Sequence, residues 1–120
     1  MISQYIQFED ITVLRSIGTG CKITRRDKSI ILTELEWTTL FSLRDEIKTC
    51  FENGGTMQEL LDPLQAKGQS AKFVIVETYN GYMYIKIRKW FWETDTYKPT
   101  REGVTLRLLQ WEELVRQVSK

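Results

Sequence analysis

The sequence predicts an α+β fold of two antiparallel strand–strand–strand–helix modules, with curved sheets backed by helices and arranged as a pseudo-twofold pair. Two observations lead to this fold class. At residues 71–92, two runs rich in β-branched and aromatic residues flank Asn80-Gly81, the dipeptide preferred in type I′ hairpin turns. In addition, two windows 74 positions apart resemble each other, and each reads as a strand that leads into an amphipathic helix.

The first module is predicted to span residues 1–55, as a degenerate copy with short strands. We expect a loop at 18–22 and short strands at 4–9, 11–17 and 29–33. Thr33 and Glu36 form a capping-box pattern, so a helix should begin after Thr33 and run to about Glu52.

Residues 56–71 are predicted to be a short helix followed by a linker. Thr56 and Glu59 repeat the capping-box pattern ahead of a leucine-rich stretch. The segment 65–71 consists mostly of small and polar residues, which is typical of linkers. The second module then occupies 72–120, and the whole chain should form one compact unit.

The hairpin turn fixes the register of the two strands around it. If Tyr79 faces Tyr82, alternation places one set of pairs on a core face: Thr78/Met83, Val76/Ile85 and Val74/Ile87. The opposite, outer face then carries Tyr79/Tyr82, Glu77/Tyr84, Ile75/Lys86, Phe73/Arg88, Trp90 and Trp92. So many aromatic side chains are unusual on a solvated surface.

After the hairpin we expect a loop at 93–98, a strand at 104–108 and a terminal amphipathic helix. Placing Trp37 on Trp111 aligns this strand and helix with 29–43, with leucines repeated at 32/106, 35/109 and 40/114. We therefore expect Trp37 and Trp111 to anchor their helices to the sheets. The first copy has almost no outer-face aromatic residues.

Composition limits the function classes. The 17 basic and 16 acidic residues leave a net charge of +1, so any electrostatic binding site must be local. The chain has no histidine, and Cys21 and Cys50 are far apart, which argues against a zinc site and favours reduced thiols. No P-loop, nucleophile elbow, signal peptide or membrane-spanning run is present. We expect an intracellular protein that is not an enzyme and uses no cofactor or metal.

The outer face of the hairpin fits single-stranded nucleic acid, which proteins hold with aromatic platforms beside a positive groove. The same face could instead dock another protein, or bind single-stranded RNA, because stacking does not distinguish the two sugars. Arg25, Arg26 and Lys28 form a charged run in the first module. They fit either a second groove or a solvated loop.

The second module also resembles a known family over residues 72–118. Its motifs are the glycine-turn hairpin, Ile87-Arg88 followed by Trp90-Phe91, the run 98–104 (KPTREGV), and Gln110-Trp111 at the helix start. Together they are similar to the single-stranded-DNA-binding domain of the transcriptional coactivator family called positive cofactor four.

That resemblance implies a curved antiparallel sheet backed by a helix, in dimers that present two channels for single strands or unwound duplex. It implies roles for Tyr79, Arg88, the Trp90/Phe91 pair and Arg101. Glu77 stands where the family tends to be basic, and Asn80 and Tyr82 replace lysines. If the first module replaces the partner subunit, the chain is a tandem, internally duplicated pseudo-dimer.

The sequence thus predicts a largely sequence-independent single-stranded-DNA-binding protein that acts in transcription or replication, in the nucleus or another DNA-containing compartment. Its partners would be single-stranded DNA, with RNA, unwound duplex and transcription or replication proteins as further candidates, and it would be a pseudo-dimer or a homodimer. The predicted nucleic-acid-binding residues are Lys72, Tyr79, Tyr82, Tyr84, Lys86, Arg88, Trp90, Phe91, Trp92, Lys98, Arg101 and Arg107.

Overall fold

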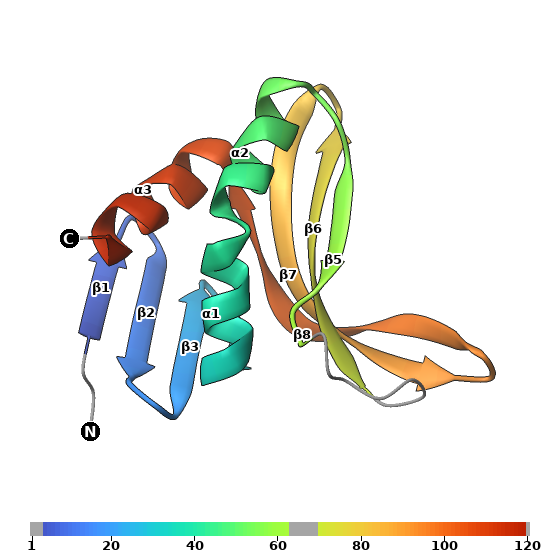
Figure 1. The fold of residues 1–120 in the computed structure, drawn as a ribbon, viewed down its shortest axis with the longest axis horizontal. Helices are drawn as coiled ribbons and strands as arrows, with labels where there is room; N and C mark the ends of the chain where they lie inside the picture. Colours follow the sequence, from blue (N-terminus) through green and yellow to red (C-terminus); the bar gives the residue numbers. More distant parts are fainter. Residues whose placement is uncertain (1–3, 63–69, 120) are drawn as a thin grey trace.

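The computed structural model describes residues 4–62 and 70–119, and within these ranges it contains two four-stranded antiparallel sheets and three helices (Figure 1). The first sheet has the order β1 (Gln4–Phe8), β2 (Ile11–Ser16), β3 (Gly20–Arg25), β4 (Lys28–Thr33), and is followed by α1 (Glu34–Ser42) and α2 (Arg44–Glu52). The second has the order β5 (Met57–Leu60), β6 (Ala71–Tyr79), β7 (Tyr82–Glu93), β8 (Thr96–Arg107), and is followed by α3 (Leu108–Val118). The predicted α+β class with two modules is confirmed, but each module has one strand more than expected.

In the first module the additional strand is β3, part of which was predicted to be a loop. Its side chains alternate, with Cys21 and Ile23 buried and Lys22 exposed between them. Gly20 opens the strand with a φ of 144°, at a point where a Cβ atom would lie 2.1 Å from the carbonyl oxygen of Leu32. The glycine pattern predicts a loop, but the strand needs Gly20 because the backbone of β4 passes so close.

In the second module the additional strand is β5, and the prediction of a short helix starting at Thr56 is wrong. Met57–Leu60 pairs antiparallel with β6, and the Leu61 N–H continues the pairing by donating to the Lys72 carbonyl oxygen at 2.9 Å. A four-residue segment has little helical stability of its own, so the unpaired edge of β6 decides its conformation. The predicted linker at 65–71 lies mostly outside the described residues, and its last residue, Ala71, belongs to β6.

The capping box that begins the first helix is present. Thr33 Oγ1 accepts from the Glu36 N–H at 3.1 Å, and Glu36 Oε1 accepts from the Thr33 N–H at 2.8 Å. The expected single helix is interrupted at Leu43, where the backbone leaves helical geometry and α1 gives way to α2.

The hairpin between β6 and β7 has the predicted turn and register. Asn80 and Gly81 have φ values of 50° and 80°, as a type I′ turn requires, and Tyr79 faces Tyr82. Every pair down to Phe73/Arg88 is as predicted. The core face contributes four fully buried side chains, Val74, Val76, Ile85 and Ile87.

The predicted loop at 93–98 is only a two-residue turn, Thr94-Asp95, with φ values of 47° and 65°. The strand expected at 104–108 therefore begins already at Thr96, and its register shifts between Arg88 and Trp90 of β7. Beyond this shift the ends of β7 and β8 project from the rest of the molecule (Figure 1).

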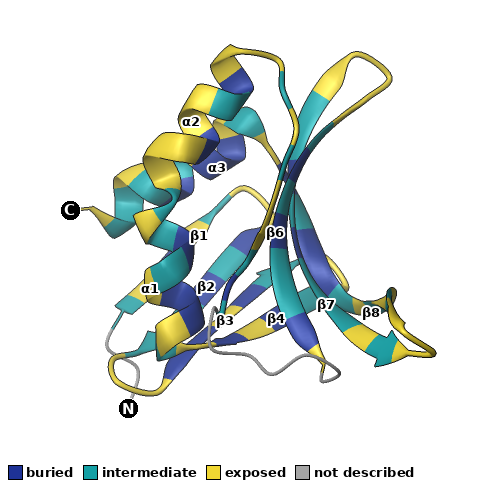
Figure 2. Ribbon diagram, turned by 45° about the vertical axis from the view of Figure 1, so that its right-hand side comes forward, coloured by how far each residue is buried: buried dark blue, intermediate teal, exposed yellow. Residues whose placement is uncertain are grey.

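Both modules contribute to one hydrophobic core, and β4 lies against β8 (Figure 2). Trp37 and Trp111 are each 2% exposed, and the Phe41 ring lies 4.5 Å from the first and 5.6 Å from the second. The predicted role of both tryptophans as buried anchors is confirmed. No helix in the described ranges is long and apolar enough to cross a membrane.

Polar contacts between the modules begin at equivalent helix positions, Glu36 and Gln110, which are the third residues of α1 and α3. Both side chains are buried. Glu36 Oε1 lies 2.9 Å from Lys72 Nζ of the second module, and Gln110 Nε2 donates to Glu9 Oε1 of the first module at 3.2 Å. Gln110 Oε1 also accepts from the Arg107 N–H at 3.0 Å.

Candidate nucleic-acid interface

The outer face of the second sheet begins with exposed tyrosines at the hairpin tip. Tyr79 and Tyr82 are 65% and 67% exposed and flank the turn. Tyr84 lies two pairs further down on the same face, with Arg107 of β8 as its neighbour. A hollow of about 230 Å³ opens here between Tyr79, Tyr84 and Thr105. Strand pairing orders the backbone that carries these rings before a ligand arrives, so that part of the entropy cost is not paid on binding.

Glu77, the acidic residue on this face, is paired. Its carboxylate contacts the ammonium group of Lys86, the diagonal neighbour on β7. The pair leaves no net charge at this point, so Glu77 does not repel a phosphate strongly. Lys86 is correspondingly less available as a cation than the sequence predicted.

Further along the sheet, the irregular part of β8 positions Arg88. Arg88 Nη1 donates to the Thr100 carbonyl oxygen at 2.9 Å, and Thr100 Oγ1 donates to the Lys89 carbonyl oxygen at 2.7 Å. Gly103 faces Arg88 across the strands, where a Cβ atom would lie 2.9 Å from the Ile87 carbonyl oxygen. This close backbone approach leaves room for the Arg88 side chain beside the exposed Arg101.

The turn between β3 and β4 of the first module lies against this same region. Arg25 Nη1 donates to the Thr105 carbonyl oxygen at 2.7 Å, which fixes the turn to β8. A hollow of about 360 Å³ is lined here by five basic residues and one acidic residue: Arg25, Arg26, Lys28, Arg88, Arg101 and Asp27, together with Gly103 and Thr105. The sequence left open whether the basic run of the first module lines a groove of its own or is solvated. In the structure it lines a groove with the second module, a contact between residues 80 apart that no local pattern reveals.

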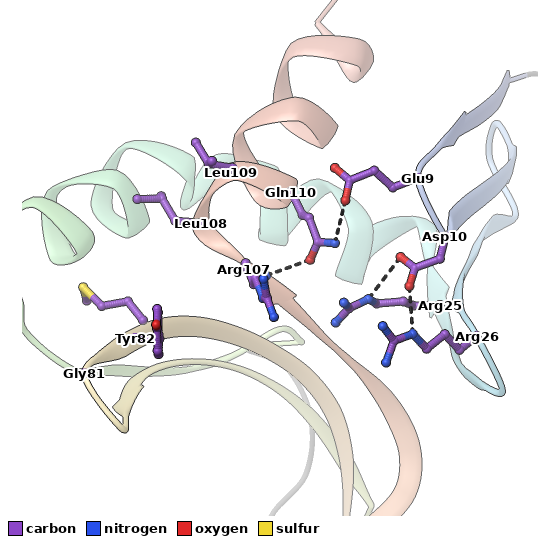
Figure 3. A pocket seen from close by; sticks show the side chains of 11 residues that line it. Glu9, Asp10, Arg25, Arg26, Gly81, Tyr82, Arg107, Leu108, Leu109 and Gln110 are labelled. Atoms are coloured by element: carbon purple, nitrogen blue, oxygen red, sulfur yellow. Dashed lines mark hydrogen bonds and ion pairs between the residues drawn. The ribbon is translucent and has the colours of Figure 1, made fainter.

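A larger hollow of about 660 Å³ continues past the same turn to the hairpin tip (Figure 3). Arg25 and Arg26 lie on one side, and Tyr82 and Arg107 on the other. Asp10 lies between the two arginines, 3.2 Å from Arg25 Nε and 2.9 Å from Arg26 Nε. Desolvation raises the pKa of Asp10, but the hydrogen bonds from both guanidinium groups outweigh it and hold the pKa below its ordinary value.

The predicted tryptophans form part of an aromatic cluster. Phe73 packs edge-on against Trp90 and Tyr97, at centroid distances of 6.4 Å and 5.3 Å, and Tyr97 packs edge-on against Trp92 at 4.9 Å. Trp90 and Trp92 are half-buried, and Trp90 Nε1 is buried without a hydrogen-bond partner among the described residues. These rings pack mainly on one another, so they stiffen the projecting ends of β7 and β8.

Three other predicted residues lie apart from the groove. Lys72 is on the core face of β6, where it pairs with Glu36, and this burial argues against a contact with nucleic acid. Phe91 alternates with the tryptophans and therefore points to the opposite side of β7. Lys98 lies on the projecting end of β8, with its Nζ 3.8 Å from Glu93 Oε2. Tyr79, Tyr82, Tyr84, Lys86, Arg88, Arg101 and Arg107 do share one face.

A curved antiparallel sheet with exposed tyrosines and a basic groove is the arrangement used by proteins that bind nucleic-acid single strands. Comparison with known families agrees with this class. Residues 67–117 match the family model Transcriptional Coactivator p15 (PC4), which confirms the resemblance seen in the sequence motifs. The match covers β6, β7, β8 and nearly all of α3, and indicates a domain like those of DNA-binding transcriptional coactivators. No curated protein and no solved structure matched the chain.

Proposed function

We propose that this protein binds single-stranded DNA, largely independently of sequence, and acts in transcription or replication. The observation that carries the proposal is the outer face of the second sheet. There, exposed tyrosines at the hairpin tip lead directly into a groove lined by Arg88 and Arg101. Bases would stack on Tyr79, Tyr82 and Tyr84, while the arginines neutralise phosphates.

The test is fluorescence anisotropy with a labelled oligo(dT), titrated with protein at low and at high salt. Stacking contributes roughly 1–3 kcal/mol per base, so replacing one tyrosine should lower the affinity between about 5-fold and 150-fold. Tyr79→Ala and Tyr82→Ala are the informative variants. Tyr5→Ala is the matched control, because Tyr5 is 61% exposed but lies on β1 of the first sheet.

We expect salt-sensitive binding by the wild type and the control, and weaker binding by both hairpin variants. No binding at low salt would reject the proposal. Equal losses for Tyr5→Ala and Tyr79→Ala would place the strand elsewhere.

RNA and protein partners are tested in the same system. Unlabelled oligo(U) should compete with oligo(dT) if the tyrosines are the main contacts, since rings do not distinguish ribose from deoxyribose. If tyrosine and tryptophan fluorescence responds to a transcription or replication protein but to neither oligonucleotide, the face is a protein-docking surface.

We also propose that the two modules form a pseudo-dimer within one chain, so that the protein acts as a monomer in a DNA-containing compartment. Two features support this proposal: each module has four strands before its first helix, and Glu36 and Gln110 occupy equivalent positions in those helices. Light scattering at the concentrations used for DNA binding should give the mass of a single 14.2 kDa chain. A dimer mass would contradict it.

A further inference from the structure

We propose that the β3–β4 turn of the first module is the phosphate-binding wall of the second module's site, so that one DNA strand contacts both modules. This inference rests on the proposed single-strand binding and assigns its phosphate contacts. The residues concerned are Arg25, Arg26 and Lys28, which the family match at 67–117 does not include.

The turn lies next to the face that carries the tyrosines. The hydrogen bond from Arg25 to the Thr105 carbonyl oxygen holds the turn at the edge of β8. The basic hollow beside Arg88 shares Thr105 with the hollow beside Tyr84. It shares Arg25 with the larger hollow beside Tyr82. The three hollows are therefore neighbours along one surface, with the tyrosines on one side and the turn on the other.

The turn also contributes most of the positive charge of the basic hollow. The whole chain has a net charge of +1, yet the basic hollow is lined by five cationic side chains and one anionic side chain. Three of the five cations come from the turn. Asp10 offsets part of the charge of Arg25 and Arg26, but one carboxylate stands against two guanidinium groups. Such a local excess attracts a polyanion even when the protein as a whole is nearly neutral.

The first sheet has no comparable aromatic surface of its own. One outward row of this sheet consists of Tyr5, Leu14, Lys22 and Ile31, and the next consists of Gln7, Thr12, Thr24 and Ser29. Tyr5 is the single aromatic residue in these two rows. The first module thus supplies cations but no stacking platform, so each chain should bind one strand.

The test compares two variants with the same change in charge. Arg26→Gln/Lys28→Gln removes two cations of the turn, and both side chains are exposed, so the fold should be unaffected. Arg44→Gln/Lys48→Gln removes two exposed cations of α2 that line none of the three hollows. Arg25 is left intact because it holds the turn to β8. Binding to labelled oligo(dT) is measured by anisotropy between about 0.05 and 0.3 M salt, and far-UV circular dichroism checks the fold.

Each phosphate contact contributes about 0.7 to the slope of log affinity against log salt for a single strand. Loss of two contacts should therefore reduce the slope by about 1.4 and the affinity at 0.1 M salt by about 25-fold. The α2 variant should retain nearly the wild-type slope. Lys28→Gln alone should give half of the slope change, and a short oligo(dT) should saturate at one strand per chain.

The outcomes separate this inference from the proposed function. If the wild type binds and both double variants have the same slope, the strand does not touch the turn and the composite groove is rejected. Two short strands per chain would also reject it. If the wild type does not bind oligo(dT) at low salt, the proposed function fails and the inference fails with it.

Discussion

The ion pair between Lys72 and Glu36 joins the two modules, and its removal should be costly. Their side chains are 16% and 7% exposed, and Lys72 Nζ lies 2.9 Å from Glu36 Oε1. Replacing Lys72 with Met keeps the apolar stem but leaves the Glu36 carboxylate buried without a cation. Breaking a buried pair in this way costs about 3–5 kcal/mol, because the remaining charge has lost its solvation.

The expected cost of Lys72→Met is about 3 kcal/mol, since the Thr33 N–H still donates to Glu36. Glu36→Gln should cost less, roughly 1–2 kcal/mol, because glutamine keeps the capping acceptor and Lys72 retains some solvent contact. Gln110 shows that glutamine is accepted at the equivalent position of α3. The double variant Glu36→Gln/Lys72→Met buries no charge at all, so it should be more stable than Lys72→Met alone.

Equilibrium unfolding in urea measures these free energies. With a urea dependence of about 1–3 kcal/mol per molar, a loss of 3 kcal/mol lowers the midpoint by roughly 1–3 M. Arg116→Met is the control, because it breaks the exposed pair with Glu113 and should cost at most about 1 kcal/mol. A Lys72→Met midpoint equal to that of Arg116→Met would show that the buried pair does not hold the modules together. Strict additivity in the double variant would show that Lys72 and Glu36 are not energetically coupled.

Two further predictions concern the first module. Burial raises the pKa of the Cys21 thiol to about 12, well above its value in the unfolded chain, so the unfolded state loses this proton first as pH rises. The stability that comes from the buried neutral thiol is complete below about pH 9 and is lost as the pH rises towards 12. Between pH 8 and 10.5 the free energy of unfolding of the wild type, measured in urea, should fall by about 2 kcal/mol more than that of Cys21→Val. Equal losses in the two proteins would contradict the raised pKa of Cys21. At Gly20, an alanine Cβ would lie 2.1 Å from the Leu32 carbonyl oxygen and collide with it. At Gly18, an alanine Cβ would meet no atom within 4 Å, and only the φ of 83° is unfavourable for alanine. Gly18→Ala should therefore cost about 1–2 kcal/mol and Gly20→Ala clearly more, and thermal unfolding that ranks them in the opposite order would show that β4 can move away.

The parts of the site that follow from alternation and turn chemistry could be predicted from the sequence. Asn80-Gly81 fixes the turn, the turn fixes the register, and the register assigns Tyr79, Tyr82 and Arg88 to the outer face. These steps need only local conformational preferences. The capping box at Thr33 is local in the same sense, and it too was found.

Other features depend on groups that are distant along the chain. Met57–Leu60 becomes a strand because β6 offers an open edge, although its own residues fit a helix start equally well. Lys72 shares the inward face of β6 with Val74 by alternation, but only the fold shows that Glu36 pairs with it there. In both cases the partner supplies hydrogen bonds or charge that no inspection of the segment alone would reveal.

Local sequence patterns therefore specify the fold class, the hairpin and the face that carries the tyrosines and Arg88. Only the tertiary structure placed Arg25, Arg26 and Lys28 beside that face, through the packing of β4 on β8 and one hydrogen bond to Thr105. The physical reason is that a strand's pleat orders side chains within a few residues. Electrostatic grooves, in contrast, form wherever folded segments bring charges together, regardless of their separation in the chain.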